Sequence, residues 1–393
     1  IDGVRPWYPQ GYGEQNLYRL TVELADGFSQ TRTVGFKQLS AEKNDPGSDC
    51  PYPYLLKVNG CPIYIKGVNL TPLDLLYGDL QESRVEPLLK LIRDANVNLI
   101  RVWGGGRIES ETFYELTDRY GIMVWQEFPQ SGAGISSLPP TDPQYLRNLE
   151  KTAREAVFKS NHVSLVAFSG GNELSDGNVP VDFSNPNIAM VKSVVDENCP
   201  WVLMYPTSGA GGWPMCDLEH KGKVFDVHGP WQYAGDAHYL LFYESDSMLH
   251  SEFGCDGMTN RPVFDRFFSP ENRKVSNMTE NLVWRHHGEW WDTSQRDASI
   301  FYPPQTLEEQ IAVSQFMQLE GLRYAVEANR RRAYRNSGSI IWQANEPFPN
   351  VSCTCLIDYF NCPKPAYYAV RQAFCRVNPN LRYETFVHRP GDT

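Results

Sequence analysis

From about residue 54 onward, short apolar runs alternate with longer stretches of helical periodicity. The clearest run covers residues 164–170 and ends in glycines, directly before Asn172 and Glu173. An apolar run of this length between glycines predicts a strand that is buried on both faces, as in a parallel sheet. A second run, residues 248–254, contains Glu252. Barrel enzymes hold their catalytic groups at the C-terminal ends of such strands, so the pattern predicts two carboxylates at one rim.

The whole region can be divided in the same way. Helical patterns occupy residues 83–95, 112–120, 142–160, 306–332 and 365–374, and a Thr306–Glu309 capping box marks the start of the fourth. Eight strand–helix units of this kind predict an α/β chain folded as a (β/α)8 TIM barrel. The strands are predicted at residues 65–70, 98–103, 122–128, 164–170, 202–206, 224–227, 248–251 and 339–342.

The first 45 residues have a different pattern. Residues 17–24 alternate apolar and polar side chains, and residues 29–36 follow as a returning strand after Asp26-Gly27. One hairpin is not stable alone in water, so we predict that residues 1–45 end an incomplete β-sandwich domain and that residues 46–393 form the barrel. Residues 40–53 predict a linker. Residues 55–64 predict a hairpin that covers the barrel as a lid.

Composition narrows the class of protein. The net charge of −11 disfavours nucleic acid and anionic membrane surfaces as partners, and no apolar run is long enough to cross a bilayer. The 10 Trp and 21 Tyr are typical either of a large core or of a surface that binds sugar rings. The first residues, Ile-Asp-Gly-Val, lack the basic and apolar pattern of a signal segment, so we expect either that a signal was removed or that the chain begins inside a larger protein. Two glycosylation sequons, at Asn277 and Asn350, are meaningful if the protein is secreted.

The cysteines leave two interpretations open and disfavour a third. Cys353, Cys355, Cys362 and Cys375 gather near the end of the chain, which favours buried thiols or one disulfide. Zinc is disfavoured because the spacing lacks paired Cys-x-x-Cys arms. We therefore predict no metal and no cofactor.

The predicted strand ends carry carboxylates, amides and tryptophans, without a serine–histidine relay or a cluster of metal ligands. Such a set suits glycoside hydrolysis, which needs one protonated acid and one ionised carboxylate. We predict Glu173 and Glu252 as this pair; the structural alternative for each is an ion pair with a neighbour such as Arg101. Other strand-end candidates are Asn69, Asp74, Arg101, Trp103, Gln126, Glu127, Asn172, Tyr205, Thr207, His228, Trp231, Trp342, Asn345 and Glu346.

Several motifs resemble glycoside hydrolase family 2, which includes β-galactosidases, β-glucuronidases, β-mannosidases and exo-β-glucosaminidases. Asn172-Glu173 and Ser251-Glu252-Phe253-Gly254 resemble its acid/base and nucleophile motifs. Residues 101–106 (Arg-Val-Trp-Gly-Gly-Gly), residues 124–128 (Val-Trp-Gln-Glu-Phe) and residues 8–13 (Tyr-Pro-Gln-Gly-Tyr-Gly) resemble its β-mannosidase-like branch. The resemblance implies that an immunoglobulin-like sandwich and an N-terminal sugar-binding domain precede the barrel.

The resemblance also implies roles for the strand-end residues. Glu173 would be the acid/base, Glu252 the nucleophile and Asn172 the partner of the substrate's 2-hydroxyl. Trp103 and Trp342 would form parts of the −1 subsite wall, with His228 and Trp231 nearby. Glu127 would be a supporting carboxylate, and its alternative is a buried structural partner. From their positions at strand ends, we also predict Arg101, Asp74 and Tyr205 as substrate-binding residues. The triglycine at 104–106 lacks the lysine of a phosphate loop and predicts tight backbone packing instead.

The resulting prediction is a retaining β-glycosidase that acts on β-mannosidic saccharides outside the cytoplasm. Leu70 stands where the mannosidase branch usually carries tryptophan, so exo-β-glucosaminidase, β-galactosidase and β-glucuronidase activities stay open. A non-catalytic carbohydrate-binding barrel and a metal-dependent barrel enzyme are the alternatives from other classes. The aromatic insertion at 256–304, which contains residues 284–291, either shapes the leaving-group side or packs on the barrel as a loop.

Overall fold

The computed structural model describes residues 3–76, 82–132, 136–289 and 292–391. Its centre is a sheet of eight short, buried strands that follow the predicted apolar runs. Their bounds are β6 Ile65–Leu70, β7 Leu99–Val102, β8 Met123–Glu127, β9 Leu165–Ser169, β12 Leu203–Tyr205, β13 Asp226–His228, β14 Leu249–Phe253 and β16 Gly338–Ile341.

All neighbouring strands of this sheet are parallel, in the order β12-β9-β8-β7-β6-β16-β14-β13. The last strand of the chain, β16, pairs with the first, β6, so the order runs around a ring. β12 and β13 form its two ends. The chain is therefore α/β, with an eight-stranded parallel sheet curled as in a TIM barrel, which confirms this part of the predicted fold.

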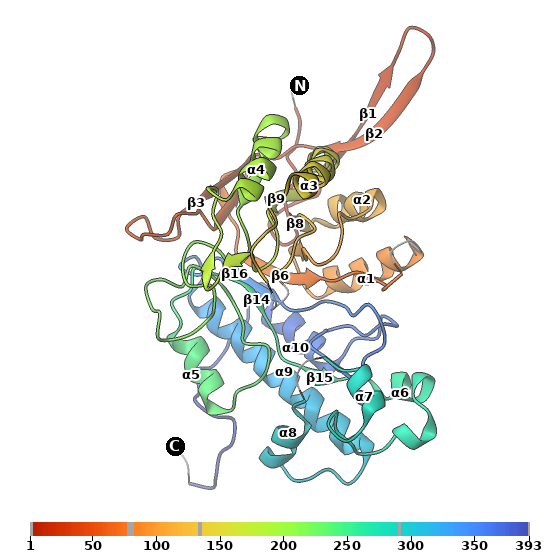
Figure 1. Ribbon diagram of the computed structural model, residues 1–393, viewed down its shortest axis with the longest axis vertical. Coiled ribbons are helices and arrows are strands. Elements are labelled where there is room, and N and C mark those ends of the chain that lie inside the picture. The colour runs from red at the N-terminus through yellow and green to blue at the C-terminus, as the bar shows by residue number, and fades with distance from the viewer. Residues whose placement is uncertain (1–2, 77–81, 133–135, 290–291, 392–393) are drawn as a thin grey trace.

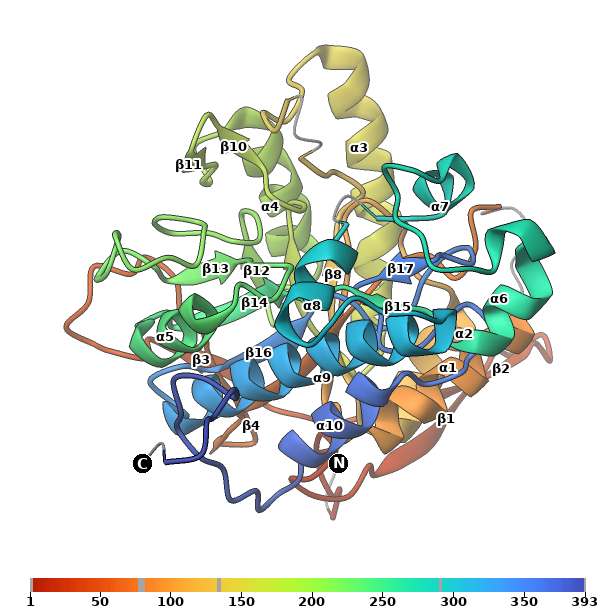
Figure 2. The ribbon, with the colours of Figure 1, turned by 90° about the horizontal axis from the view of Figure 1, so that it is seen from below.

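Helices surround the sheet (Figure 1). The connections between strands contain α1 Glu82–Asp94, α2 Glu111–Tyr120, α3 Pro143–Ala156 with the 3-10 turn η1 Val157–Asn161, α4 Pro186–Asn198, α5 Asp236–Glu244 and α9 Leu307–Arg331, and α10 Pro365–Ala373 follows β16. The capping box predicted at Thr306 is present at the start of α9. In Figure 2, α9 runs beside α10 along one side of the molecule.

The prediction of eight strand–helix units is wrong for the fifth unit. The segment between β12 and β13 contains no helix, although all of its residues are described. Gly209, Gly211, Gly212 and Gly222 fall in it, and glycine disfavours a helix because it leaves the backbone with the most freedom to lose.

The N-terminal residues pack against the barrel at the end where its strands begin. Trp7 is fully buried, and its Nε1 donates to the carbonyl of Asp118 at 2.8 Å. Strands β3 Leu39–Glu42, β4 Leu55–Val58 and β5 Cys61–Pro62 form an antiparallel sheet. The predicted linker is therefore wrong at its start, because Leu39–Glu42 pairs with β4. Leu56 and Val58 join one apolar cluster with the first residues of three barrel strands: Ile65, Leu99 and Met123.

The predicted N-terminal hairpin is confirmed as β1 Leu17–Glu23 and β2 Ser29–Gly35. It extends away from the rest of the chain (Figure 1). Leu20, Val22 and Phe28 are each more than half exposed, at 51%, 51% and 55%. The sandwich that these strands were predicted to end is not confirmed by the described residues, in which β1 and β2 form a sheet of two strands.

The insertion before α9 packs on the barrel. It contains α6 Arg261–Phe267, the 3-10 turn η2 Pro270–Asn272, α7 Leu282–His286 and α8 Ser294–Ile300, and β15 Gly257–Met258 pairs with β17 Ser352–Cys353. A small hairpin, β10 Ser175–Asp176 with β11 Val179–Pro180, follows β9. Trp284 is buried in a cluster with Leu307 and Ile311 of α9, as the packed-loop interpretation expects. Trp290 and Trp291 lie outside the described residues.

Three expectations about the surface can be compared with the structure. All nine cysteines are free thiols, so the disulfide alternative is not met in the structure. Asn277 and Asn350 are buried, at 8% and 3% exposed, and neither sequon presents its side chain to solvent. In the described part of the chain, no helix is long and apolar enough to span a bilayer.

Candidate active site

Polar side chains gather at the C-terminal ends of the barrel strands. Arg101 comes from β7, Glu127 ends β8, His228 ends β13 and Glu252 lies in β14, while Glu173 follows β9. The strands are parallel, so all of these ends face the same rim of the sheet. In the sequence, the two predicted catalytic glutamates are 79 residues apart, yet the fold brings them together.

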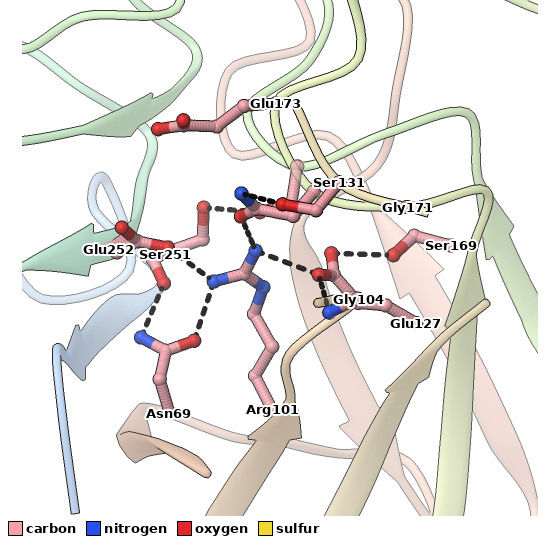
Figure 3. A network of polar contacts seen from close by, with 12 residues as sticks. Asn69, Arg101, Gly104, Glu127, Ser131, Ser169, Gly171, Glu173, Ser251 and Glu252 are labelled. Atoms are coloured by element: carbon pink, nitrogen blue, oxygen red, sulfur yellow. Dashed lines mark hydrogen bonds and ion pairs between the residues drawn. The ribbon is translucent and has the colours of Figure 1, made fainter. Parts of the chain in front are cut away.

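Arg101 is the centre of this group and has no solvent-exposed surface. Its Nη1 donates to Asn69 at 2.5 Å and to Glu252 Oε2 at 2.8 Å. Its Nη2 donates to Glu127 Oε2 at 3.0 Å and to Asn172 Oδ1 at 2.5 Å. Figure 3 shows the guanidinium between the two carboxylates. A planar fork that serves four acceptors fixes the side chains of four different strand ends relative to one another.

Glu127 uses both of its carboxylate oxygens inside the protein. Oε2 accepts from Arg101 and from the Gly104 backbone N–H at 2.8 Å, and Oε1 accepts from the Ser169 hydroxyl at 2.9 Å. A Cβ on Gly104 would meet the carbonyl oxygen of Gln130 at 2.3 Å, which confirms the predicted tight packing of the triglycine. Glu127 therefore supports Arg101, and it is fully buried.

Glu252 receives two fixed N–H donors. Trp231 Nε1 donates to Oε1 at 2.9 Å, and Arg101 donates to Oε2 at 2.8 Å. Burial raises the pKa of the Glu252 carboxyl, whereas neighbouring His228 and Arg101 act in the opposite direction. Donors that point at both oxygens favour the ionised form of this carboxyl.

Glu173 has a different environment. Its Oε1 lies 2.8 Å from His228 Nδ1, and 38% of its side chain is exposed. Burial raises the pKa of the Glu173 carboxyl, and Arg101 opposes this effect. The backbone of Glu173 has φ 52°, a left-handed conformation that costs a non-glycine residue on the order of 1 kcal/mol or more. Its N–H donates to the carbonyl of Ser208 at 2.6 Å, which holds the residue in this conformation.

His228 connects the acid to a buried hydroxyl pair. Its Nε2 lies 2.9 Å from Ser208 Oγ, which in turn lies 2.9 Å from Ser251 Oγ. Burial lowers the pKa of the His228 imidazole to about 3, so the ring is neutral at ordinary pH. A neutral imidazole places no positive charge beside Glu173 and therefore does not force that carboxyl to ionise.

The separation of the two glutamates bears on the chemistry they can perform. One oxygen of Glu173, one oxygen of Glu252 and one ring nitrogen of His228 lie within 4.8 Å of one another. Retaining glycosidases place their carboxyl groups about 5–5.5 Å apart, and inverting enzymes about 6.5–9.5 Å apart. Figure 3 shows the Glu173 carboxylate above the Arg101 network, on the side of Glu252. The spacing fits direct attack by one carboxylate better than a water held between the two.

The other predicted site residues differ in whether they contact the Arg101 network. Trp103 and Trp342 lie together, with ring centroids 5.4 Å apart in an edge-to-face arrangement, and both are half-buried. Asn172 holds Arg101 and donates to Ser131 Oγ at 3.2 Å. Asp74 lies outside the Arg101 network: its Oδ2 accepts from the Tyr359 hydroxyl at 2.6 Å and from Arg84 at 3.3 Å.

Tyr205 is not brought to this group. Its hydroxyl donates to the carbonyl of Pro53 at 2.7 Å, and its ring stacks on Tyr54 with centroids 5.3 Å apart. It belongs to the apolar cluster that fills the opposite end of the barrel. Conversely, strand-end reasoning missed Ser208 and Ser131, which contact His228 and Asn172. The position of Ser208 directly after Thr207, at the end of the fifth strand, was the available signal.

Two groups of side chains have donor atoms close enough to share a metal ion: Glu173 with His228 and Glu252, and Glu346 with Cys353 and Cys355. The first is the paired-glutamate group described above. In the second, one carboxylate oxygen and the two sulfur atoms lie within 4.8 Å of one another.

Comparison with known proteins shows which proteins this chain is similar to. Residues 54–194 match the family model described as the TIM barrel domain of glycosyl hydrolases family 2. A β-mannosidase B from Aspergillus niger is 27% identical over 98% of this chain and 48% of its own length. A β-mannosidase from Mus musculus is 27% identical over 96% of this chain and 46% of its own. The chain thus spans about half the length of the curated relatives it matches.

Solved structures show the same similarity. The β-D-mannosidase from Dictyoglomus thermophilum is 26% identical with a TM-score of 0.80, over 95% of this chain and 47% of that one. An exo-chitosanase from Amycolatopsis orientalis shares the fold at 19% identity, with a TM-score of 0.71 over 94% of this chain and 44% of that one. The predicted resemblance to the family is confirmed by these matches.

Proposed function

From the premise that this chain carries the TIM barrel of glycoside hydrolase family 2, we propose that it is the catalytic part of a retaining β-glycosidase. The observation that carries the proposal is the Glu173–Glu252 pair, with one oxygen of each carboxylate within 4.8 Å of the other. Its substrate is a β-mannosidic saccharide. This choice of sugar rests on relatives named β-mannosidase along nearly the whole chain.

The unequal environments of the two glutamates support their assignment. Glu252 accepts from both Arg101 and Trp231, so it is the ionised nucleophile. Burial raises the pKa of Glu173 and neutral His228 places no positive charge beside it, so we assign the proton of the free enzyme to this carboxyl. Paired carboxyls with different surroundings are how one site holds an acid and a base at the same pH.

The reaction then follows in two displacements. Glu252 attacks the anomeric carbon while Glu173 gives its proton to the leaving oxygen, which forms a glycosyl-enzyme ester. Glu173, now ionised, takes a proton from water, and that water cleaves the ester and restores Glu252. Arg101 keeps the Glu252 carboxylate oriented throughout, since it contacts Oε2 and leaves Oε1 to Trp231.

The sugar itself would be held by residues around this pair. Trp103 and Trp342 offer apolar faces to the ring, and Asn172, fixed by Arg101, is the partner we assign to the 2-hydroxyl. Asp74 is held by Tyr359 and Arg84 at the rim and reaches hydroxyls farther from the anomeric carbon.

Aryl β-glycosides with manno, gluco, galacto, glucosamine and glucuronide configurations test the proposal. We expect the highest kcat/KM with the mannoside; preference for another sugar would replace the substrate but keep the mechanism. Glu252→Gln should fold and have almost no turnover. Glu173→Ala should regain activity with azide on substrates whose leaving group is good. Absence of hydrolysis across the panel would favour a binding barrel, and activity that requires an added metal would favour the metal-dependent class.

Two further properties are part of the proposal. The exposed apolar side chains of the β1–β2 hairpin support its place at the end of an immunoglobulin-like sandwich, with a sugar-binding domain before it. An extracytoplasmic location is proposed without support from the sequons, whose asparagines are buried. Fractionation of the source cells, followed by detection of the protein, tests the location.

A further inference from the structure

A second cluster of acidic side chains lies around Gln343, the residue that follows Trp342 in the chain. Glu346 comes from the loop that follows β16, Cys353 lies in β17 and Cys355 follows two residues later. Glu289 reaches the cluster from the insertion before α9. Glu346, Cys353 and Cys355 are 1%, 2% and 1% exposed. Three buried groups thus meet one half-buried carboxyl that comes from a distant segment.

Three of these groups, Glu346, Cys353 and Cys355, have donor atoms about as close as the ligands of one metal ion, and Glu289 adjoins them through Cys353. Cys353 Sγ lies 3.1 Å from Glu289 Oε1, and Cys355 Sγ lies 3.5 Å from Glu346 Oε2. The Glu346 oxygen and both sulfurs lie within 4.8 Å of one another. Ligands of a tetrahedral zinc ion, with bonds of about 2.1 Å to oxygen and 2.3 Å to sulfur, are separated by about 3.6 Å.

The two carboxylates of the cluster accept hydrogen bonds from neutral donors: Glu289 from Thr354 and Gln343, and Glu346 from Asn350 and the Tyr359 backbone N–H. Buried Lys364 faces both carboxylates, but its Nζ donates to the carbonyls of Gly257 and Cys353 instead of to a carboxylate. One ammonium therefore stands against two carboxylates and two thiols in a buried place. A divalent cation would supply the missing positive charge, which a low-dielectric site requires.

An unpartnered acceptor lies at the same point. The amide nitrogen of Gln343 donates to Glu289 Oε1 at 3.1 Å and lies 3.5 Å from Cys353 Sγ. Its Oε1 is buried without a hydrogen-bond partner. A buried polar atom of this kind is uncommon and calls for a ligand or an ordered water.

We propose that Cys353, Cys355, Glu346 and Glu289 bind one zinc ion. Binding releases the two thiol protons to solvent, and the thiolates and carboxylates then complete four-coordinate zinc. Because the protein supplies all four ligands, the site is structural. It ties the insertion to the loop after β16, directly beside Trp342. This set differs from the four-cysteine set considered from the sequence, since Cys362 is exposed and Cys375 contacts Arg371 and Asn96.

Zinc content and cobalt spectra test the proposal. Protein dialysed against chelator and then given zinc should retain about one zinc per chain after desalting. Cobalt in place of zinc should give the ultraviolet charge-transfer band of a thiolate ligand. The double variant Cys353→Ser/Cys355→Ser should lose both signals, whereas Cys50→Ser/Cys199→Ser, with the same number of changes elsewhere, should keep them.

The outcomes separate this site from the paired glutamates. The Glu252→Gln variant should keep its zinc, and loss of zinc in that variant would assign the metal to the other group. Should the double serine variant fail to fold, Glu346→Gln and the wild-type cobalt spectrum still decide. Folded wild-type protein that binds no zinc, or binds cobalt without a thiolate band, would overturn the proposal. Glycosidase activity can fail or persist independently of any of these results.

Discussion

Replacing Arg101 by methionine should destabilise the protein severely, because it leaves two buried carboxylates without their cation. The guanidinium donates to Glu252 at 2.8 Å and to Glu127 at 3.0 Å, and both acids are nearly or fully buried. A hydrogen bond to a charged group contributes about 1.5–3 kcal/mol, so losing two removes about 3–6 kcal/mol. Measurements on broken buried ion pairs give a similar range, about 3–5 kcal/mol.

The loss should also depend on pH. Burial already raises the pKa values of Glu127 and Glu252, and without Arg101 these values rise further. A raised folded-state pKa means that the folded protein binds more protons than the unfolded chain between the ordinary glutamate value, about 4.3, and the raised value. Stability of the variant therefore increases as pH falls through that window, and the destabilisation should be smaller at pH 5 than at pH 7.

Urea unfolding of wild type and Arg101→Met at both pH values measures the effect directly. Arg84→Met is the matched control, because Arg84 also pairs with an acid, Asp74, but both side chains are 18% exposed. We expect the control to lose about 1 kcal/mol or less, without the pH dependence, since hydrogen bonds from Leu76 and Tyr359 lower the pKa of Asp74. A loss for Arg101→Met that is below about 1 kcal/mol, or equal at both pH values, would refute the reasoning.

Four more predictions concern Tyr205, Trp231, Glu173 and His228. Tyr205→Phe removes a hydrogen bond to a backbone carbonyl and should lower stability by about 1 kcal/mol without changing KM; a raised KM would contradict the placement of this side chain. Trp231→Phe removes one of the two N–H donors to Glu252 and should lower kcat/KM about tenfold. Steady-state kinetics measures this loss, and circular dichroism should show an unchanged fold. The kcat/KM of the wild type should fall as pH rises through the raised pKa of Glu173, and this alkaline limb should vanish in Glu173→Ala; a limb that persists would assign it to another group. His228, with its pKa near 3, should add no limb between pH 5 and 9.

Much of the fold could be predicted because its signals are local. The apolar runs of the eight strands and the capping box at Thr306 lie within a few residues of the elements they specify. The placement of Glu173 and Glu252 at strand ends follows from the same runs. The predicted linker failed at Leu39–Glu42 because a strand of only four residues, which pairs with the next strand β4, has no distinct local pattern.

Tyr205 lies at the end of a barrel strand but does not reach the site. The number of residues from the end of an apolar run gives a position along one strand. Barrel strands are tilted and staggered, so residues at the same position in two strands can lie at different levels along the barrel axis. Tyr205 ends its strand as Glu127 ends β8, and the two pair with the same residue of β9, Ser169. Yet Glu127 meets Arg101 while the Tyr205 ring packs on Trp125, on the side of the apolar cluster.

The different roles that we propose for the two glutamates depend on contacts that no local pattern contains. Both are glutamates at the ends of buried strands, and both have carboxyl pKa values raised by burial. What separates them is the neighbour each receives from another strand: Arg101, which is 151 residues away from Glu252, and His228, which is 55 residues away from Glu173. One neighbour is a permanent cation, which opposes the effect of burial on the pKa of Glu252, and the other is a neutral ring, which places no positive charge beside Glu173. The division of roles that we propose therefore depends on the neighbours that the curled sheet brings to each glutamate, and not on the glutamates alone.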